Sequence, residues 1–139
     1  MRGANLRGNG DSGGVTLIVY ESEVVASVGS RRVYLAPQVG KLDDGDPLLR
    51  FVCSMAAYAL AARDGSAPGP YTQARAELFA RLALIDDDQF EMLDATGLPE
   101  ELLAGHFGVP LEQVARKRQD LSARRGRELG EAHRRSVEL

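Results

Sequence analysis

The residues that could carry chemistry in this chain are few and lie far apart along the sequence. It contains two histidines, His106 and His133, in different predicted elements, and a single cysteine, Cys53, among apolar residues. No nucleophile has a base beside it, so no catalytic triad can be assembled. Cys53 is expected to be a buried, inert thiol and His106 a turn or packing residue. The aspartate-rich segments 43–46 and 86–88 lack the pattern of a calcium loop, and solvated turns and helix caps explain them.

The segment 49–60 (LRFVCSMAAYAL) is apolar on all faces and has no turn signal, which predicts a buried helix. Its layout resembles the active-site helix of the ImmA/IrrE family of small zinc peptidases, which reads L-R-F-x-x-A-H-E-x-x-H. Aligning the Arg-Phe pair places Met55 and Ala59 at the two histidines and Ala56 at the glutamate. In H-E-x-x-H the histidines hold zinc from one helix face and the glutamate activates its water. These three residues can do neither, and we expect them to face inward and fill the former cleft.

Further segments extend this resemblance over residues 31–121. Residues 32–35 resemble the strand before the active-site helix. Residues 76–85 resemble the family helix E-A-N-x-F-A-x-x-L-L-M-P. Residues 103–110, together with Val114 and Arg118, resemble the closing segment L-A-x-x-F-G-V-S…V…R-L. The third zinc ligand of the family falls at Arg75, whose positive charge would repel a metal ion. The resemblance therefore implies a zincin-like scaffold that has lost its three ligands and its catalytic glutamate.

What the resemblance implies about function is regulation without catalysis. Active members of the family are linked to cleavage of repressor proteins in mobile elements and stress responses, and often lie beside helix-turn-helix regulators. We expect a catalytically inactive regulatory protein, not an enzyme, which uses no metal or cofactor. Its partner is expected to be a protein such as a transcriptional repressor, for example a helix-turn-helix regulator. The sequence indicates neither the partner-binding residues nor the oligomeric state.

A DNA-binding regulator is the alternative hypothesis, and it comes from the segment 98–121. Ala104, Gly108 and Val114 keep the spacing of a helix-turn-helix, with a small residue at the helix contact, glycine in the turn and an apolar anchor in the second helix. That second helix is expected to show four polar residues to solvent: Glu112, Gln113, Arg116 and Lys117. In a DNA reader they would meet base edges and phosphates. The same corner occurs in ImmA/IrrE domains as helix packing, so both interpretations stay open.

The distribution of charge bears on the same question. Residues 1–115 carry 9 Lys and Arg against 16 Asp and Glu, whereas residues 116–139 carry 8 against 4, within a net charge of −3. A basic end on an acidic body can mark contact with nucleic acid or an acidic partner, and Arg124 and Arg125 are further candidate phosphate contacts. A solvated amphipathic helix explains the pattern equally. No apolar run reaches the ~18 residues of a membrane helix and no apolar signal core begins the chain, so a cytoplasmic protein without membrane contact is expected.

The order of the expected strands and helices predicts an α+β fold. It consists of a small sheet followed by a helical bundle that ends in a helix-turn-helix-like pair of helices. A disordered leader is expected at 1–14, the ImmA/IrrE-like domain at 15–121 and a basic helix or tail at 122–139. Three strands are expected at 15–20, 24–28 and 32–36. Helices are expected at 47–63, 73–85 with Thr72 as its N-cap, 89–95, 98–105 and 110–121. In the second helix, the apolar face is expected to be formed by Ala76, Phe79, Ala80 and Ala83.

Overall fold

A computed structural model describes residues 4–9, 15–20, 23–28, 31–67 and 69–137 of the chain. It divides into two compact units, Met1–Asp86 and Asp87–Leu139, each of which has its own internal packing. In the described residues, the first unit holds an antiparallel sheet with helices, and the second holds helices alone. The predicted α+β class is therefore confirmed. The division at Asp86 falls inside 15–121, the range predicted as one domain.

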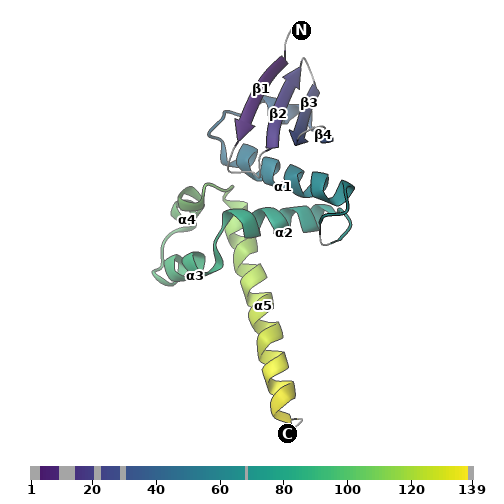
Figure 1. The fold of residues 1–139 in the computed structure, drawn as a ribbon. Coiled ribbons are helices and arrows are strands. Elements are labelled where there is room, and N and C mark those ends of the chain that lie inside the picture. Colours follow the sequence, from purple (N-terminus) through teal and green to yellow (C-terminus); the bar gives the residue numbers. More distant parts are fainter. Residues whose placement is uncertain (1–3, 10–14, 21–22, 29–30, 68, 138–139) are drawn as a thin grey trace. The chain divides into compact units, whose positions relative to one another are not determined.

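The sheet of the first unit has four strands in the order β1-β2-β3-β4, all antiparallel to their neighbours (Figure 1). The strands are β1 (Ala4–Asn9), β2 (Val15–Tyr20), β3 (Glu23–Val28) and β4 (Arg31–Leu35). The prediction of three strands after a disordered leader is wrong for residues 4–9. These residues lack the alternation that marks a strand in sequence, and they form one by pairing with β2, where Leu6 opposes Ile18. The rest of the predicted leader, 1–3 and 10–14, lies outside the described residues.

Helix α1 (Pro47–Arg63) begins and ends as the sequence predicts. The Asp46 side chain caps its start by accepting a hydrogen bond from the Leu48 amide at 2.8 Å. Pro47 occupies the first turn, where a backbone N–H would have no partner within the helix, so its missing N–H costs no hydrogen bond. Leu49, Cys53 and Ala56 lie on one face of α1 and join a buried apolar cluster. The sheet contributes four side chains to that cluster: Val15, Leu17, Val24 and Ala26.

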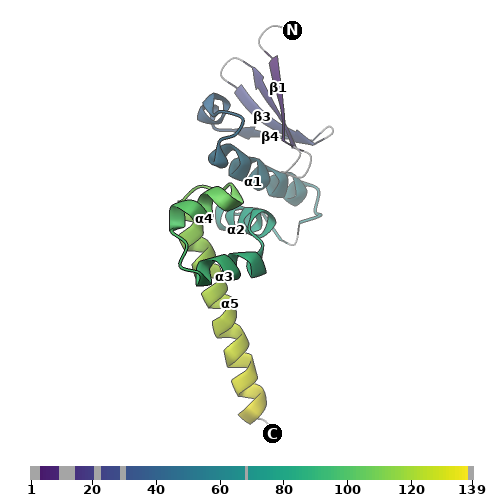
Figure 2. The same cartoon turned by 90° about the vertical axis from the view of Figure 1, so that its left-hand side faces the viewer.

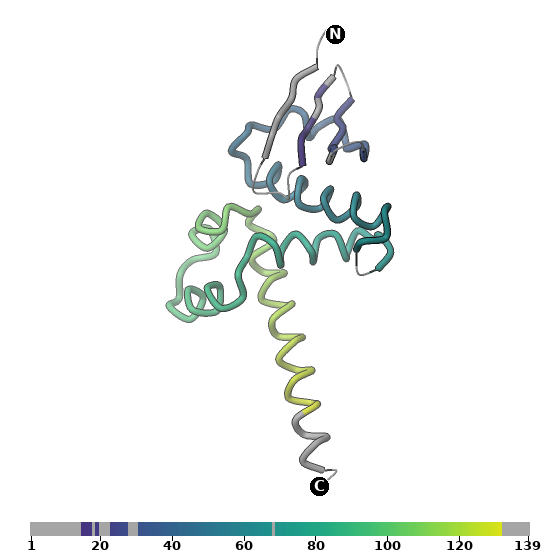
Figure 3. Tube along the Cα trace, viewed as in Figure 1, coloured from purple at the N-terminus to yellow at the C-terminus, as the bar shows by residue number. Residues whose placement is uncertain are grey.

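Helix α2 (Gln73–Leu84) returns alongside α1, as the trace in Figure 3 shows. Thr72 caps its start by accepting a hydrogen bond from the Arg75 amide at 3.1 Å. Ala76 and Ala80 are fully buried, and such small side chains let two helix backbones approach closely. Helix α1 therefore contacts the sheet on one side and α2 on the other, which explains why its sequence is apolar all round and confirms the predicted buried helix.

The end of α1 also braces the edge of the sheet at β4. The Arg63 guanidinium donates a hydrogen bond to the Arg32 carbonyl oxygen, and the Asp64 carboxylate pairs with Arg31. A short 3-10 helix, η2 (Pro37–Lys41), follows β4 and buries Val39 in the same apolar cluster. The chain therefore contacts α1 or its C-terminal end both in β4 and in the η2 segment that follows it.

The second unit contains α3 (Asp87–Ala95), α4 (Glu100–Phe107) and α5 (Glu112–Val137), seen together in Figure 2. Gly97, with φ of 79°, follows α3, and Gly108, with φ of 66°, caps α4; both adopt the left-handed conformation that glycine tolerates best. The rings of Phe90 and Phe107 lie 5.9 Å apart. The large buried apolar residues of this unit are Phe90, Leu103, Phe107, Val109, Val114 and Leu121.

The residues predicted as a separate tail, 122–139, continue the second helix of the corner without a break as far as Val137. Side chains 122–131 are exposed except that of Arg124, which is half-buried, so this part of α5 is a solvated helix. No helix in the described part of the chain combines the length and the apolar character needed to cross a membrane.

Candidate functional site

The three residues that the resemblance aligns with H-E-x-x-H lie on α1. Ala56 is 3% exposed and belongs to the apolar cluster against the sheet, whereas Met55 and Ala59 are half-buried. The prediction that all three face inward is confirmed for Ala56 and holds only in part for the other two. Two methyl groups and a thioether line this part of the helix. They supply no imidazole to hold zinc and no carboxylate to accept a proton.

Arg75, which the resemblance aligns with the third zinc ligand, is exposed and contacts the loop that precedes α2. Its amide donates to the Thr72 hydroxyl at 3.1 Å, and its guanidinium fills the space that a β-carbon on Gly69 would occupy. The residue is therefore positioned against the α1–α2 loop. Among the residues that the structure describes, no three His, Cys, Asp or Glu side chains converge as a group that could hold a metal ion.

The outer face of α2 carries large apolar side chains on the same face as Arg75. Leu78, Phe79 and Leu82 lie three, four and seven positions after Arg75, and these spacings place them on the same side of the helix as Arg75. Leu78 is 39% exposed, Phe79 37% and Leu82 57%, and Tyr71 in the preceding loop is 48% exposed. We call these four apolar residues (Tyr71, Leu78, Phe79 and Leu82) the α2 apolar surface.

The α2 apolar surface corrects the prediction for this helix. Ala76 and Ala80 do face the interior, but Phe79 and Ala83 are exposed. The fully buried residues of α2 are the small Ala76 and Ala80. The ring of Phe79 lies 5.3 Å from the buried ring of Tyr58. The sequence does contain a signal of this exposed apolar surface, because large apolar residues are spread around more than one face of α2.

The helix-turn-helix-like corner forms as the spacing predicts. Ala104 is 6% exposed and Val114 fully buried, and Gly108 makes the turn in the left-handed region with φ of 66° and ψ of 41°. The Val109 amide donates to the Ala104 carbonyl oxygen at 3.1 Å and closes the end of α4. The side chain at position 104 must be small and that at 114 apolar for this packing.

The predicted solvent-facing set of α5 is wrong at two of its members. Gln113 is 2% exposed and Lys117 1% exposed, while Glu112 and Arg116 are exposed as expected. Gln113 and Lys117 are four residues apart and flank Val114, so they lie on the packed face of the helix. The lysine is accommodated there because its ammonium group pairs with the Asp87 carboxylate at the start of α3. Neither residue is available to contact DNA in this conformation.

The remaining predicted phosphate contacts, Arg124 and Arg125, are both engaged by α3. Arg124 pairs with Asp87, and its Nη2 lies 3.8 Å from Oε1 of Glu91. Arg125 pairs with the other oxygen of Glu91, with Nη2 to Oε2 at 3.1 Å. The hydrogen bond from Lys117 lowers the pKa of Asp87 below its ordinary value of 3.8, and Arg124 adds to the effect against the opposing influence of burial.

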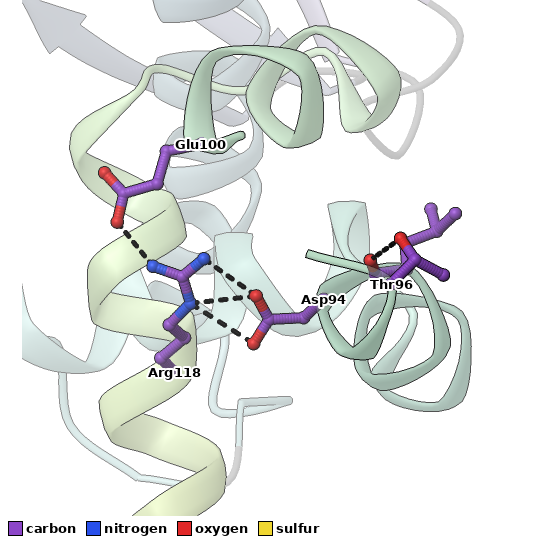
Figure 4. Close-up of polar contacts among 5 residues, drawn as sticks. Asp94, Thr96, Glu100 and Arg118 are labelled. Carbon is purple, nitrogen blue, oxygen red and sulfur yellow. Dashed lines mark hydrogen bonds and ion pairs between the residues drawn. The ribbon is translucent and has the colours of Figure 1, made fainter. Parts of the chain in front are cut away.

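Arg118, which the sequence singled out only for the resemblance, joins all three helices of the second unit (Figure 4). Its Nη2 lies 2.7 Å from Oδ1 of Asp94, its Nε lies 3.1 and 3.2 Å from the two carboxylate oxygens of Asp94, and its Nη1 pairs with Glu100. The Asp94 hydrogen bonds raise the pKa of Arg118 above its ordinary value, with Glu100 contributing in the same direction. This forked contact is the stronger type of ion pair.

Two complementary surfaces therefore meet inside the second unit. The basic face of α5 consists of Lys117, Arg118, Arg124 and Arg125, and the acidic face of α3 consists of Asp87, Glu91 and Asp94. Four of the eight Lys and Arg residues of the basic end 116–139 are thus paired with carboxylates within their own unit. Residues 87–139 as a whole carry 8 Lys and Arg against 11 Asp and Glu, a net charge of −3.

No protein-family model, no curated protein and no solved structure matches this chain. The resemblance to ImmA/IrrE peptidases therefore stays a prediction carried by the motifs within residues 31–121.

Proposed function

We propose that the chain is a catalytically inactive, metallopeptidase-like regulatory protein that binds a partner protein such as a transcriptional repressor. The observation that carries the proposal is the α2 apolar surface, whose three helical residues share a helix face with Arg75, the position where the resemblance places the third metal ligand. Four large apolar side chains that are between 37% and 57% exposed lie within one helix and its preceding loop. Exposed apolar surface of this kind, gathered at one place, is characteristic of protein-binding sites.

The absence of catalysis in this proposal rests on residue types. Met55, Ala56, Ala59 and Arg75 carry no group that can bind zinc or activate water at the four positions where the peptidases need one. Metal analysis of protein purified without a histidine tag, combined with a peptidase assay on unfolded protein substrates, tests this part. Stoichiometric zinc together with proteolysis would overturn it.

The partner-binding part is tested by substitutions within the α2 apolar surface. Tagged chain carrying Leu78→Glu and Leu82→Glu should lose a partner protein that the wild type retains from cells in which the chain is naturally made. Burying two introduced carboxylates in an apolar interface removes the binding energy of the contact. Met92→Glu is the matched control, because Met92 is a 62% exposed apolar residue of the other unit. Equal retention by the double variant and the control would exclude this surface.

The second candidate function is DNA binding through residues 98–121, and the corner formed by Ala104, Gly108 and Val114 favours it. Helix α5 would then be the recognition helix. Its exposed residues near the corner include Glu112, Arg116 and Gln119, a mixed set rather than a basic one. A mobility-shift titration with duplex DNA at low salt, comparing wild type with Arg116→Ala, tests whether this face binds DNA directly. Salt-sensitive binding that is lost in the variant would support it.

A further inference from the structure

The basic face of α5 has the composition of a phosphate-binding surface but binds carboxylates instead. Lys117, Arg118, Arg124 and Arg125 lie within eight residues of one another on one side of the helix. Each pairs with a carboxylate of α3, and Arg118 also pairs with Glu100 of α4. The forked contact between Arg118 and Asp94 is the geometry that arginine also uses for phosphate. The carboxylates of the acidic face of α3 therefore form ion pairs with these cations, as the phosphates of a nucleic-acid backbone would.

Helix α3 is held to its unit by one buried aromatic side chain and by these charges. It is nine residues long, and Phe90 is its one fully buried residue. Only one of its ion pairs is deeply buried, because Lys117 is 1% exposed whereas the side chains of Arg118, Arg124 and Arg125 are 36%, 43% and 59% exposed. Exposed ion pairs of this kind contribute little to stability and weaken as salt rises.

The contact between the two faces is also incomplete. In the described part of the chain, the Nε atom of Arg124 is buried without a hydrogen-bond partner, and Oε1 of Glu128 lies 3.6 Å from it. A pocket of about 320 Å³ lies beside the ion pairs and is lined by Phe90, Asp94, Arg118, Leu121, Arg125 and neighbouring residues. The acidic face thus neutralises the basic face without packing tightly against it, which is the arrangement expected of a contact that can be exchanged.

We propose that the acidic face of α3 is an autoinhibitory cover, and that its displacement releases the basic face of α5 to bind the phosphates of duplex DNA. Duplex DNA is the proposed polyanion because the basic face extends over about 12 Å of helix, and a duplex presents several phosphates over that distance. The binding is to the backbone and carries no sequence preference of its own. It does not depend on the partner protein proposed for the α2 apolar surface.

The test is a variant that removes charge from the cover while keeping the buried pair of Lys117 with Asp87. Glu91→Gln with Asp94→Asn removes the α3 carboxylates that pair with Arg125 and Arg118 and one of the two that pair with Arg124, while Arg118 keeps Glu100 and Arg124 keeps Asp87. The matched control is Asp88→Asn with Glu101→Gln, which changes the net charge equally at two exposed acids of α3 and α4. Binding of the full chain to a random 20-base-pair duplex is measured by fluorescence anisotropy at several salt concentrations.

The Glu91→Gln, Asp94→Asn variant is expected to bind the duplex at least about tenfold more tightly at 50 mM salt than both the wild type and the control. For two to three released phosphate contacts, its affinity should fall roughly 10- to 40-fold between 50 and 200 mM salt. Equal binding by variant and control would overturn the proposal, because net charge alone would then explain any gain. Binding by neither, or strong binding by the wild type, would overturn it as well.

A loss of structure is detected by helical circular dichroism, which must match that of the wild type. If the double variant fails this check, Glu91→Gln alone replaces it, since Glu91 contacts only the half-exposed Arg124 and the exposed Arg125 among its ion-pair partners in the described chain. The single control is then Glu101→Gln. A gain in duplex affinity confined to Glu91→Gln supports the cover, and the same affinity in both variants excludes it.

Discussion

Helix α1 and the first half of helix α5 are both packed helices, but they are held by opposite kinds of contact. Helix α1 lies between the sheet and α2 and presents apolar side chains such as Leu49, Cys53 and Ala56 to its neighbours. Helix α5 buries Val114 and Leu121 but surrounds them with the ion pairs of its basic face. Apolar contacts carry no charge that salt can screen or that pH can titrate, whereas exposed ion pairs respond to both. The first unit should therefore be stable under conditions that loosen the second.

The largest expected effect is the burial of a charge in α1. Ala56→Glu places a carboxylate at a 3% exposed position in the apolar cluster against the sheet, and we expect a loss of about 4 kcal/mol in the free energy of unfolding. Ala59→Glu, at a half-buried position one turn away, should lose about 1 kcal/mol. Urea unfolding of both variants measures the difference. Equal losses would show that the two sides of α1 are packed alike.

The next effect comes from the buried ion pair of α5. Lys117→Ala leaves Asp87 without its buried cation and opens a cavity, so we expect a loss of about 3 kcal/mol. Lys117→Met removes the same charge but fills most of the volume, and should lose less. The comparison is made by thermal unfolding in the same buffer. If the two variants are equally unstable, the charge of Lys117 matters and its packing does not.

Acid should loosen the second unit through Asp87. Its pKa is lower in the folded chain than its ordinary value of 3.8, so its stabilising contribution is fully present above pH 3.8 and is lost as the pH falls through the lower folded value. Unfolding free energies measured from about pH 5 to pH 2 should decline more steeply for the wild type than for Asp87→Asn. Parallel curves for the two proteins would contradict the role assigned to this carboxylate.

The smallest expected effect is at Arg118. Arg118→Lys keeps the charge but loses the forked contact with Asp94, and the half-exposed position limits the loss to about 0.5–1 kcal/mol. Arg127→Lys on the exposed part of the same helix is the control and should change stability very little. A chemical denaturation series with several repeats resolves such a difference. A loss in both variants would point to helix propensity rather than to the ion pair.

Local signals explain why α1 and α2 were predictable from the sequence. Asp46 followed by Pro47 marks the start of α1, and Thr72 marks the start of α2, because each supplies the cap that a helix start requires. The turn at Gly108 was predictable for a similar reason, since a left-handed backbone favours glycine. In each case the residue and the structure it dictates are neighbours in the chain.

Contacts between distant residues explain the failures. Strand β1 has no strand-like sequence of its own and exists through its pairing with β2. Lys117 has the polarity of a surface residue, and its burial depends on Asp87, thirty positions earlier in the chain. The α2 apolar surface was not predicted for the same reason, because the tertiary packing of α2 buries Ala76 and Ala80 and leaves Leu78 and Leu82 exposed. A single sequence shows neither which segments pair as strands nor which of these side chains are buried.

The hydrogen bond from Arg63 to the Arg32 carbonyl oxygen has a consequence for how the protein behaves in concentrated solution. An edge strand with unpaired backbone groups is a template on which strands of other molecules can add, and this addition is a route to aggregation. At β4 the guanidinium occupies one of those groups, and the ion pair between Arg31 and Asp64 holds the helix end beside it. The last turn of α1 thereby protects this edge of the sheet against intermolecular strand pairing.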